Sequence, residues 1–351
     1  MSLKISANKH TRLFMKKSLL VLLCALLAVS CGVSQKATSF SEQQSVSVTQ
    51  IYGSGFDQMP DNYFKFLPAN GIDTGSKIIF RENTFGKGLV AYHYHFDNLF
   101  ASVQDISIVE IDPRRYIFRV ADHKGLKRTS EMAIEAGGVA AMNGTFYDMK
   151  KGGSVCYLQI DGVVADTTKG KDMKIRANGA VVIMKGKLSI EWWNQAKEDR
   201  FEIELKKNTS VMATMPLLIN DGYAVELPYY KGFSDKRHPR SVVFEKDGKI
   251  CLMVIDGRSK GNAAGMTLDE VQRYLLSLDG GKGCQNAVNL DGGGSSTLWL
   301  KPSSGEKYSN GATAPDASIQ GTGVINHPSD NGKFDHKGER RVANSIIVLS
   351  K

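Results

Sequence analysis

Short apolar segments separated by glycine-containing or charged turns recur from residue 104 to the end of the chain, and they constrain the fold more than any other feature. Residues 106–111 and 116–120 read as two strands joined by the turn Asp112-Pro113-Arg114. Further strands are predicted at residues 139–142, 155–160, 178–184, 187–192, 240–245, 249–255, 287–291, 297–300 and 344–349. Strands dominate without a regular alternation with helices. We therefore expect an α+β fold, one large mixed-sheet domain with few helices, over residues 101–351.

Two helices are predicted within this domain, and the second has the clearer signal. Residues 129–136 are predicted to form a short helix, which ends at the pair Gly137-Gly138. Thr267 stands three residues before Glu270, which is the spacing of a capping box, and an apolar stripe follows it.

The N-terminal segment has the features of an export signal. Residues 19–29 form an apolar run after two lysines, and this run is shorter than the roughly 20 residues that span a bilayer. Cys31 follows at once, as in a bacterial lipoprotein signal, although ordinary cleavage that leaves a free cysteine is the alternative. We expect a signal peptide (residues 1–30), lipidation of Cys31, a flexible tether (residues 31–50) and an N-terminal accessory segment (residues 51–100). The expected location is the bacterial cell envelope, with membrane contact through the lipid anchor only.

The net charge gives little support for a nucleic-acid partner. The chain has 45 basic and 36 acidic residues, a formal charge of +9. Five of the basic residues and none of the acidic ones lie in residues 1–30, so the remainder carries only +4. No basic run with interleaved aromatics occurs there, and we expect no nucleic-acid partner.

Cysteine and histidine residues leave two questions open. Cys156, Cys251 and Cys284 follow the leader, and either Cys251 pairs with Cys284 or all three are small buried hydrophobic residues. No cysteine or histidine spacing indicates zinc. His93 and His95 lie on one face of a predicted strand, where they could bind a metal or a sugar, but hydrogen-bonded surface residues are favoured.

The most informative segment is a glycine-rich turn over residues 289–297. Asn289 and Leu290 end an apolar strand, and Asp291 precedes Gly292, Gly293, Gly294, Ser295 and Ser296. Three successive glycines cost backbone entropy and expose consecutive N–H groups, so they favour the close approach of a ligand. A glycine-rich loop at the edge of the core is the alternative.

Three other segments place polar residues at strand ends. Asn143 follows a strand of small apolar residues, Arg240 begins a strand that would fix its guanidinium group, and Asp256 and Arg258 flank a glycine at the end of the next strand. Each also has a structural interpretation: a turn asparagine, an exposed cationic loop, and a salt bridge. The chain lacks the GxSxG, GxxxxGK[ST], GxGxxG and HExxH motifs, which argues against an ordinary serine hydrolase and a nucleotide cradle.

Together these segments closely resemble the phosphodiester glycosidase family over roughly residues 100–350. The resemblance is carried by Asn143-Gly144-x-Phe146-Tyr147, Arg237-His238-Pro239-Arg240, Asp256-Gly257-Arg258, Thr267-x-x-Glu270, Asn289 to Ser296 and Arg341-Val342-Ala343-Asn344. One departure is that the family usually has Asn-Gly-Gly-Phe-Phe at the first of these segments.

The resemblance implies hydrolysis of a sugar-1-phosphodiester, with an N-acetylhexosamine as the expected sugar, in envelope or host glycans. Asp291 and Asp256 would then be the catalytic carboxylates, one acting on water or carbon and the other on protonation. Arg240, Arg258 and the glycine turn would bind phosphate, and Asn143 and Asn289 would orient sugar hydroxyls. No cofactor is required, although a divalent cation near Asp291 or Asp148 is possible. Alternatives are a phosphodiesterase that cleaves the other P–O bond and a non-catalytic glycan-binding lipoprotein.

Overall fold

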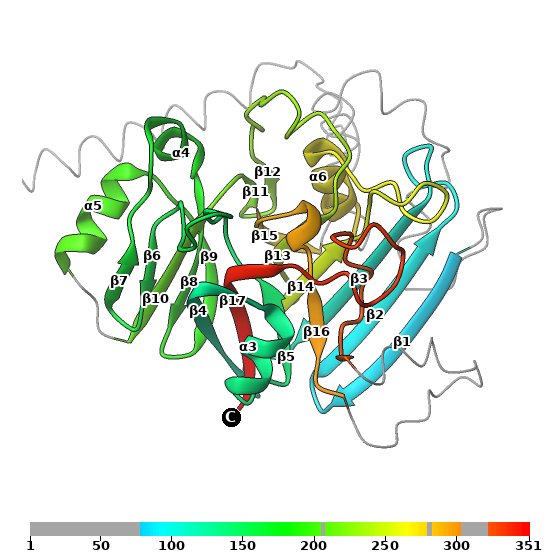
Figure 1. Cartoon of the computed structure of the whole chain (residues 1–351), viewed down its shortest axis with the longest axis horizontal. Coiled ribbons are helices and arrows are strands. Elements are labelled where there is room, and N and C mark those ends of the chain that lie inside the picture. Colours follow the sequence, from blue (N-terminus) through cyan, green and yellow to red (C-terminus); the bar gives the residue numbers. More distant parts are fainter. Residues whose placement is uncertain (1–77, 205–207, 279–282, 303–321) are drawn as a thin grey trace, which may run out of the picture. The chain divides into compact units, whose positions relative to one another are not determined.

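The computed structural model describes residues 78–204, 208–278, 283–302 and 322–351, which are drawn in colour in Figure 1. All of them belong to one compact unit that spans Asp61–Lys351. The predicted signal peptide, Cys31 and the tether lie outside the described residues, so these expectations stay predictions.

The largest sheet carries most of the polar strand ends that the sequence singled out. Its eight strands lie in the order β1 (Ile78–Gly86), β2 (Leu89–Phe96), β3 (Gln104–Ile111), β14 (Lys249–Ile255), β13 (Arg240–Lys246), β15 (Cys284–Asn289), β11 (Leu217–Asn220) and β12 (Tyr223–Ala224). Strand β13 lies between β14 and β15, with Val242 opposite Met253 on one side and Asn289 on the other. The start of β13 therefore lies beside the ends of β14 and β15, at the same end of the sheet.

Two smaller sheets complete the strand framework. One has the order β7 (Val163–Asp166), β6 (Leu158–Ile160), β10 (Thr209–Thr214), β8 (Gly179–Met184) and β9 (Lys187–Trp192). The other has the order β16 (Leu298–Leu300), β5 (Ala140–Asn143), β17 (Arg341–Ser350) and β4 (Tyr116–Arg128).

The sheets correct one part of the sequence prediction. Strands dominate and helices are few, as expected, but the strand pairs among the described residues are all antiparallel. The expected mixed sheet is therefore three antiparallel sheets. The physical reason is that parallel neighbours need long crossover connections, whereas hairpins such as β13–β14 place antiparallel strands side by side.

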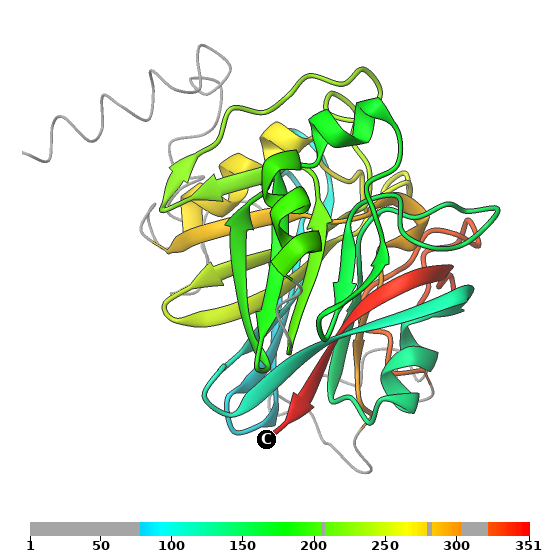
Figure 2. The ribbon, with the colours of Figure 1, turned by 90° about the vertical axis from the view of Figure 1, so that its left-hand side faces the viewer.

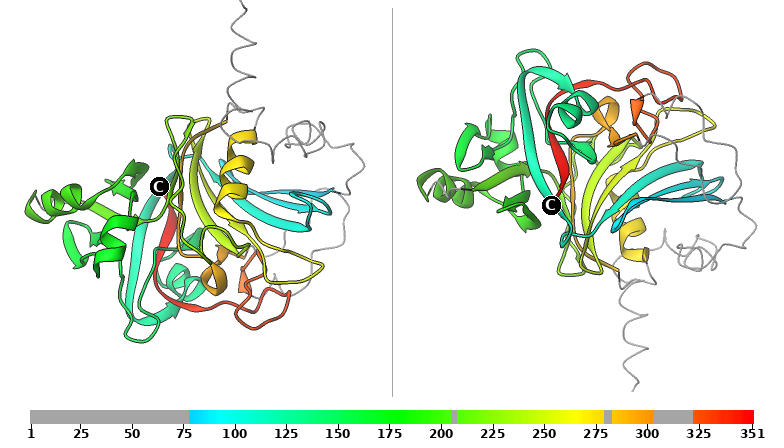
Figure 3. Two further views of the ribbon diagram at one scale, coloured as in Figure 1. Left: turned by 90° about the horizontal axis from the view of Figure 1, so that it is seen from above. Right: turned by 90° about the horizontal axis from the view of Figure 1, so that it is seen from below.

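One hydrophobic core joins the three sheets. Val109 of β3, Met142 of β5, Val181 of β8, Val243 of β13 and Ile346 of β17 belong to the same cluster, and each is fully buried. The views in Figures 2 and 3 show these sheets side by side. The core fixes the relative positions of β5 and β13, whose ends carry Asn143 and Arg240.

Four α-helices are described, namely α3 (Thr129–Glu135), α4 (Lys171–Arg176), α5 (Gln195–Glu204) and α6 (Leu268–Ser277). The predicted capping box is confirmed, because Thr267 Oγ1 accepts a bond from Glu270 N at 3.1 Å and Glu270 Oε2 accepts one from Thr267 N at 2.9 Å. Helix α6 lies against the large sheet, where Gln272 Nε2 donates to Leu218 O at 2.7 Å (Figure 3). No helix in the described part of the chain is long and apolar enough to cross a bilayer.

The cysteine question is resolved in favour of separate thiols. Cys156, Cys251 and Cys284 are all buried and free, so the alternative of a bond between Cys251 and Cys284 is wrong. Burial raises the pKa of Cys156 to about 12, which keeps this thiol protonated and unreactive.

Candidate functional site

Segments that are far apart in the sequence meet at the glycine turn that follows β15. Leu290 N donates to Ser241 O at 2.8 Å and Gly293 N to Pro239 O at 2.9 Å. Asp291 N donates to Gly144 O, just beyond β5, at 3.1 Å. These contacts bring the end of β5, the start of β13 and the end of β15 together at this turn.

Asn143 ties the turn to the two neighbouring strands. Its Nδ2 donates to Asp291 O at 2.7 Å, while its Oδ1 accepts bonds from Ser241 Oγ at 2.7 Å and Thr297 N at 3.1 Å. The side chain is buried and its amide is occupied by the protein. The expectation that Asn143 orients sugar hydroxyls is corrected, because its amide instead holds the backbone of Asp291 in place.

Asn289 has a comparable structural position on β15. Its Nδ2 donates to Met215 O at 2.7 Å and to Leu290 O at 2.8 Å, and the residue is buried. The donors that were expected to contact sugar hydroxyls thus bind main-chain carbonyls. Asn289 therefore fixes the entry to the turn.

Arg240 was expected to bind phosphate, and its surroundings correct that expectation. Its Nε donates to Met266 O at 2.9 Å, and its Nη2 donates to Phe233 O at 2.7 Å and Lys236 O at 3.0 Å. Arg240 is 1% exposed, and burial lowers the pKa of its guanidinium group to about 10. This guanidinium group holds three loop carbonyls, so it has little capacity left for a phosphate.

Asp291 is the predicted catalytic residue that remains partly accessible, at the start of the glycine turn. Desolvation raises the pKa of its carboxyl group to about 6, an effect that Ser295, Arg340, the N–H of Gly292 and Arg258 partly offset. A carboxyl group with this pKa exchanges its proton near neutral pH, as acid–base or nucleophilic catalysis requires.

Two guanidinium groups lie directly over the glycines. A Cβ atom on Gly293 would stand 2.7 Å from Arg258 Nη2, and a Cβ atom on Gly294 would collide with the guanidinium group of Arg340. Arg258 is exposed and has a φ of 62°, a strained conformation for a non-glycine residue that is typical of functional sites. The absence of side chains at these glycines allows both cations to approach Asp291.

The backbone of the turn differs from the anion-binding nest that the sequence suggested. The N–H groups of Asp291, Gly293, Ser295 and Ser296 all donate to main-chain carbonyls. An anion at this site would therefore meet the side chains of Arg258 and Arg340 in place of a row of free N–H groups.

Arg340 and Tyr147 are the functional candidates that the sequence prediction missed. Arg340 Nε donates to Asp330 Oδ1 at 2.7 Å, which orients the guanidinium group. The positive charge of Arg340 favours the charged form of the Asp291 carboxyl group, and the charge of Asp291 in turn disfavours the charged form of Tyr147. Burial raises the pKa of Tyr147, whose hydroxyl donates to Arg341 O at 3.0 Å. Arg340 directly precedes the Arg341-Val342-Ala343-Asn344 segment of the family resemblance, and this adjacency was the available signal.

The hydroxyl groups at the end of the turn are buried. Ser295 lies close enough to Asp291 to favour its charged form. The hydroxyl oxygens of Ser296 and Thr297 are buried and have no hydrogen-bond partner among the described residues. The predicted role of Ser295 and Ser296 in substrate binding remains a prediction.

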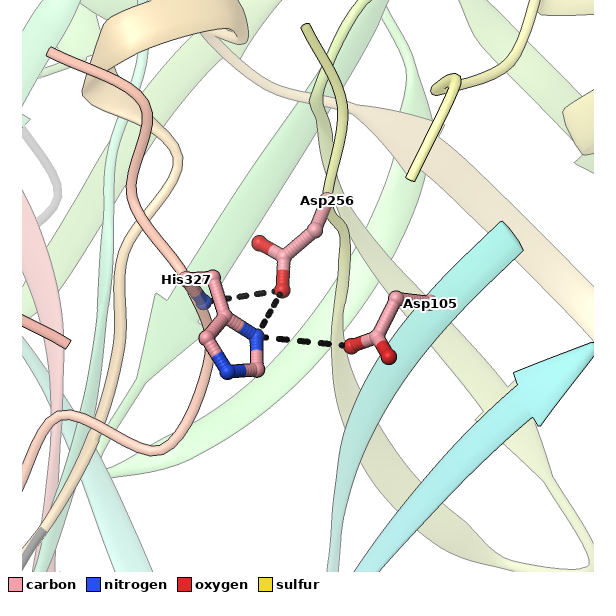
Figure 4. Close-up of side chains that lie close together, drawn as sticks. All are labelled: Asp105, Asp256 and His327. Carbon is pink, nitrogen blue, oxygen red and sulfur yellow. Dashed lines mark hydrogen bonds and ion pairs between the residues drawn. The ribbon is translucent and has the colours of Figure 1, made fainter. Parts of the chain in front are cut away.

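Asp256, the second predicted catalytic carboxylate, lies in a different group of side chains (Figure 4). Its Oδ2 accepts bonds from His327 N at 2.8 Å and His327 Nδ1 at 3.1 Å, and its Oδ1 accepts one from Asn326 Nδ2 at 2.8 Å. Asp105 of β3 faces the same imidazole ring, with Oδ1 3.5 Å from Nδ1. We therefore revise the expected pairing of Asp256 with Asp291, because the contacts of Asp256 are with Asn326 and His327.

His93 and His95 extend this second group from β2. His95 Nδ1 lies 3.0 Å and His93 Nε2 3.3 Å from Asp105 Oδ2, which confirms that they are hydrogen-bonded or ion-paired residues on one strand face. Burial disfavours the charged form of Asp105, but His327, His93 and His95 hold the pKa of Asp105 well below its usual range. Burial also disfavours charge on His327, yet Asp105 and Asp256 raise the pKa of His327 to about 10.

Comparison with known proteins gives one family and several distant relatives. Residues 136–349 match the model of the phosphodiester glycosidase family. The catalytic domain of zebrafish N-acetylglucosamine-1-phosphodiester alpha-N-acetylglucosaminidase, auto-inhibited by its pro-peptide, is similar in fold, with a TM-score of 0.51 and 19% identity over 81% of this chain and 86% of that one. A protein from Burkholderia pseudomallei has a TM-score of 0.53 and 12% identity over 81% of this chain and 99% of that one.

One curated protein is similar over a shorter stretch. The SPbeta prophage-derived uncharacterized protein YomE of Bacillus subtilis is 31% identical over 96 residues, which are 27% of this chain. The matched stretch is only 14% of the length of that relative.

Proposed function

The chain belongs to the phosphodiester glycosidase family, and we propose that it hydrolyses sugar-1-phosphodiesters and separates the sugar from the phosphate. The observation that carries this proposal is the position of Asp291, a partly exposed residue whose desolvated carboxyl group has a pKa of about 6 and lies near two guanidinium groups. A carboxylate suits attack on an electron-poor sugar carbon or activation of water, and the cations suit a phosphate.

The reaction adds water across the bond between sugar C1 and the phosphate oxygen. Arg258 and Arg340 would bind the phosphate and stabilise the negative charge that grows on it as the C1–O bond breaks. A phosphate monoester is a good leaving group, so one carboxyl group beside C1 can suffice. We assign this position to Asp291, which would either attack C1 or remove a proton from water.

The sugar and the cellular setting belong to the proposal as well. The zebrafish protein of similar fold is named as an N-acetylglucosamine-1-phosphodiester alpha-N-acetylglucosaminidase, which makes an N-acetylhexosamine the first sugar to test. We propose that the enzyme works in the cell envelope, held by a lipid on Cys31, because the sequence before this residue has the pattern of a lipoprotein signal. A Cys31→Ser variant that stays in the detergent phase in a phase-partition assay would refute the lipid anchor.

A product screen on synthetic hexosamine-1-phosphodiesters in ¹⁸O-labelled water tests the reaction. We expect free sugar with the label on the C1 hydroxyl group and an unlabelled phosphomonoester. Label on the phosphate would instead identify a phosphodiesterase that breaks the P–O bond. Saturable binding without any product would identify a glycan-binding protein, and either result would refute the proposal.

A further inference from the structure

We propose that Asp105, Asp256 and His327 form a binding site for one divalent transition-metal cation, such as Zn²⁺ or Mn²⁺. One ligand atom from each residue lies within 4.8 Å of the other two. The three residues come from β3, from the turn directly after β14 and from the segment before β17, and Figure 4 shows their side chains facing one another. This site is separate from the roles proposed for Asp291.

The spacing of the ligand atoms suits such a cation. His327 Nδ1 lies 3.1 Å from Asp256 Oδ2 and 3.5 Å from Asp105 Oδ1. Zinc is bound by histidine nitrogen and carboxylate oxygen at about 2.0–2.2 Å, which in a tetrahedral site places neighbouring ligand atoms about 3.3–3.6 Å apart. Two carboxylates and one imidazole nitrogen are also a donor set that intermediate divalent cations accept. Small movements of the side chains would complete the site.

A buried oxygen atom provides the second, independent observation. Asp105 is 2% exposed, and its Oδ1 is buried with no hydrogen-bond partner among the described residues. An ionised carboxylate oxygen in this position is costly unless a cation or a donor contacts it. His327 Nδ1 lies 3.5 Å from this oxygen, which is beyond hydrogen-bonding distance. A metal ion bound between the two atoms would replace the proton on Nδ1 and contact both of them, which would satisfy this oxygen.

The surrounding residues hold the other oxygen of each carboxylate. Asp105 Oδ2 is fixed by His95 and His93, and Asp256 Oδ1 is fixed by Asn326. Metal ligands are characteristically oriented in this way by a second layer of hydrogen bonds. Each carboxylate therefore has one oxygen anchored by neighbours and one directed toward the imidazole nitrogen.

The cation would fasten the segment that carries Asp330 to the large sheet. Asn326 Nδ2 also donates to Ser296 O at 3.1 Å, so the metal site and the glycine turn share a residue. Asp330 in turn orients Arg340 over Gly294. The metal would thus act as a positioning element for Arg340 and would take no part in bond breaking.

Metal analysis of the full chain, purified without a polyhistidine tag, tests the site without any substrate. The protein is stripped with EDTA, loaded with Zn²⁺, desalted and analysed by inductively coupled plasma mass spectrometry. We expect about one zinc ion per chain and a higher Tm after loading. We expect Asp105→Asn and His327→Gln to bind zinc more than about 100-fold more weakly, since each loses a direct ligand. Asp235→Asn is the matched control, because Asp235 is an exposed carboxylate that accepts bonds from Gly232 N and the Tyr229 hydroxyl group, and this variant should retain zinc.

Equal zinc content in the wild type and in Asp105→Asn would overturn the proposal, as would a wild type that retains no zinc and no manganese after loading. If the variants fold poorly, the wild type alone still decides. Co²⁺ loading should produce visible absorption bands of a nitrogen- and oxygen-bound ion, and a spectrum identical to that of aqueous Co²⁺ would refute the site. These outcomes do not depend on glycosidase activity, so the two proposals fail separately.

Discussion

Replacing Asp291 with asparagine should raise stability and abolish activity, and the effect on stability should depend on pH. The carboxyl group has a pKa of about 6 in the folded protein against an ordinary value of 3.8, chiefly because it is desolvated. A shift of about 2 units corresponds to about 3 kcal/mol, since each unit is worth about 1.4 kcal/mol. The folded-state pKa is the higher one, so folding is favoured below pH 4 and this advantage is lost as the pH rises through 6.

Asp291→Asn removes this titration and keeps the shape of the side chain. At pH 8 the variant should therefore be more stable than the wild type by up to about 3 kcal/mol, and the difference should vanish near pH 4. Thermal unfolding at both pH values measures this as a gain of roughly 4 °C or more at pH 8. Other titrating groups, including His327, affect both proteins alike. A variant that is less stable at pH 8, or that differs equally from the wild type at both values, would refute the reasoning.

The same variant should lose at least about 100-fold in kcat/KM on a sugar-1-phosphodiester at pH 8. Arg258→Lys should raise KM about tenfold, because an ammonium group lacks the planar fork that binds phosphate, and unchanged kinetics would remove Arg258 from phosphate binding. Gly294→Ala should lower kcat/KM about 100-fold, because the added methyl group displaces the Arg340 guanidinium group; a circular dichroism spectrum checks that the fold persists. Asn143→Ala should lower the free energy of unfolding by about 3 kcal/mol in urea titrations, because it leaves three buried polar groups without partners. A loss below about 1 kcal/mol would contradict this role.

The sequence predicted the local elements of the fold better than their assembly. Thr267 and Glu270 identified the start of α6, because a capping box uses only neighbouring residues. The predicted strands 240–245 and 249–255 are also confirmed as β13 and β14, which pair as a hairpin of neighbouring segments. The division of the strands among three sheets depends on contacts between distant segments, such as β15 with β11, and no local pattern encodes those contacts.

The candidate site illustrates a second limit. The sequence identified the residues that converge, but it could not distinguish a side chain that faces outward from one that holds the turn together. Asn143 and Arg240 have the donors that suit a sugar and a phosphate, yet both donate to main-chain carbonyls. A buried loop without regular hydrogen bonding needs such partners, so polar residues near a site serve the scaffold as often as the ligand.

The glycine turn connects these observations. Gly293 and Gly294 allow Arg258 and Arg340 to lie against the backbone next to Asp291, which a side chain at either position would prevent. Two cations near a carboxyl group would normally lower its pKa far below neutrality, but desolvation outweighs them and leaves the pKa at about 6. A phosphate bound between the guanidinium groups would neutralise their charge and raise the pKa of Asp291 further. Substrate binding and proton transfer would therefore be coupled at this turn. The apparent pKa in the pH profile of kcat, which reports the enzyme–substrate complex, should be higher than the apparent pKa in the profile of kcat/KM, which reports the free enzyme.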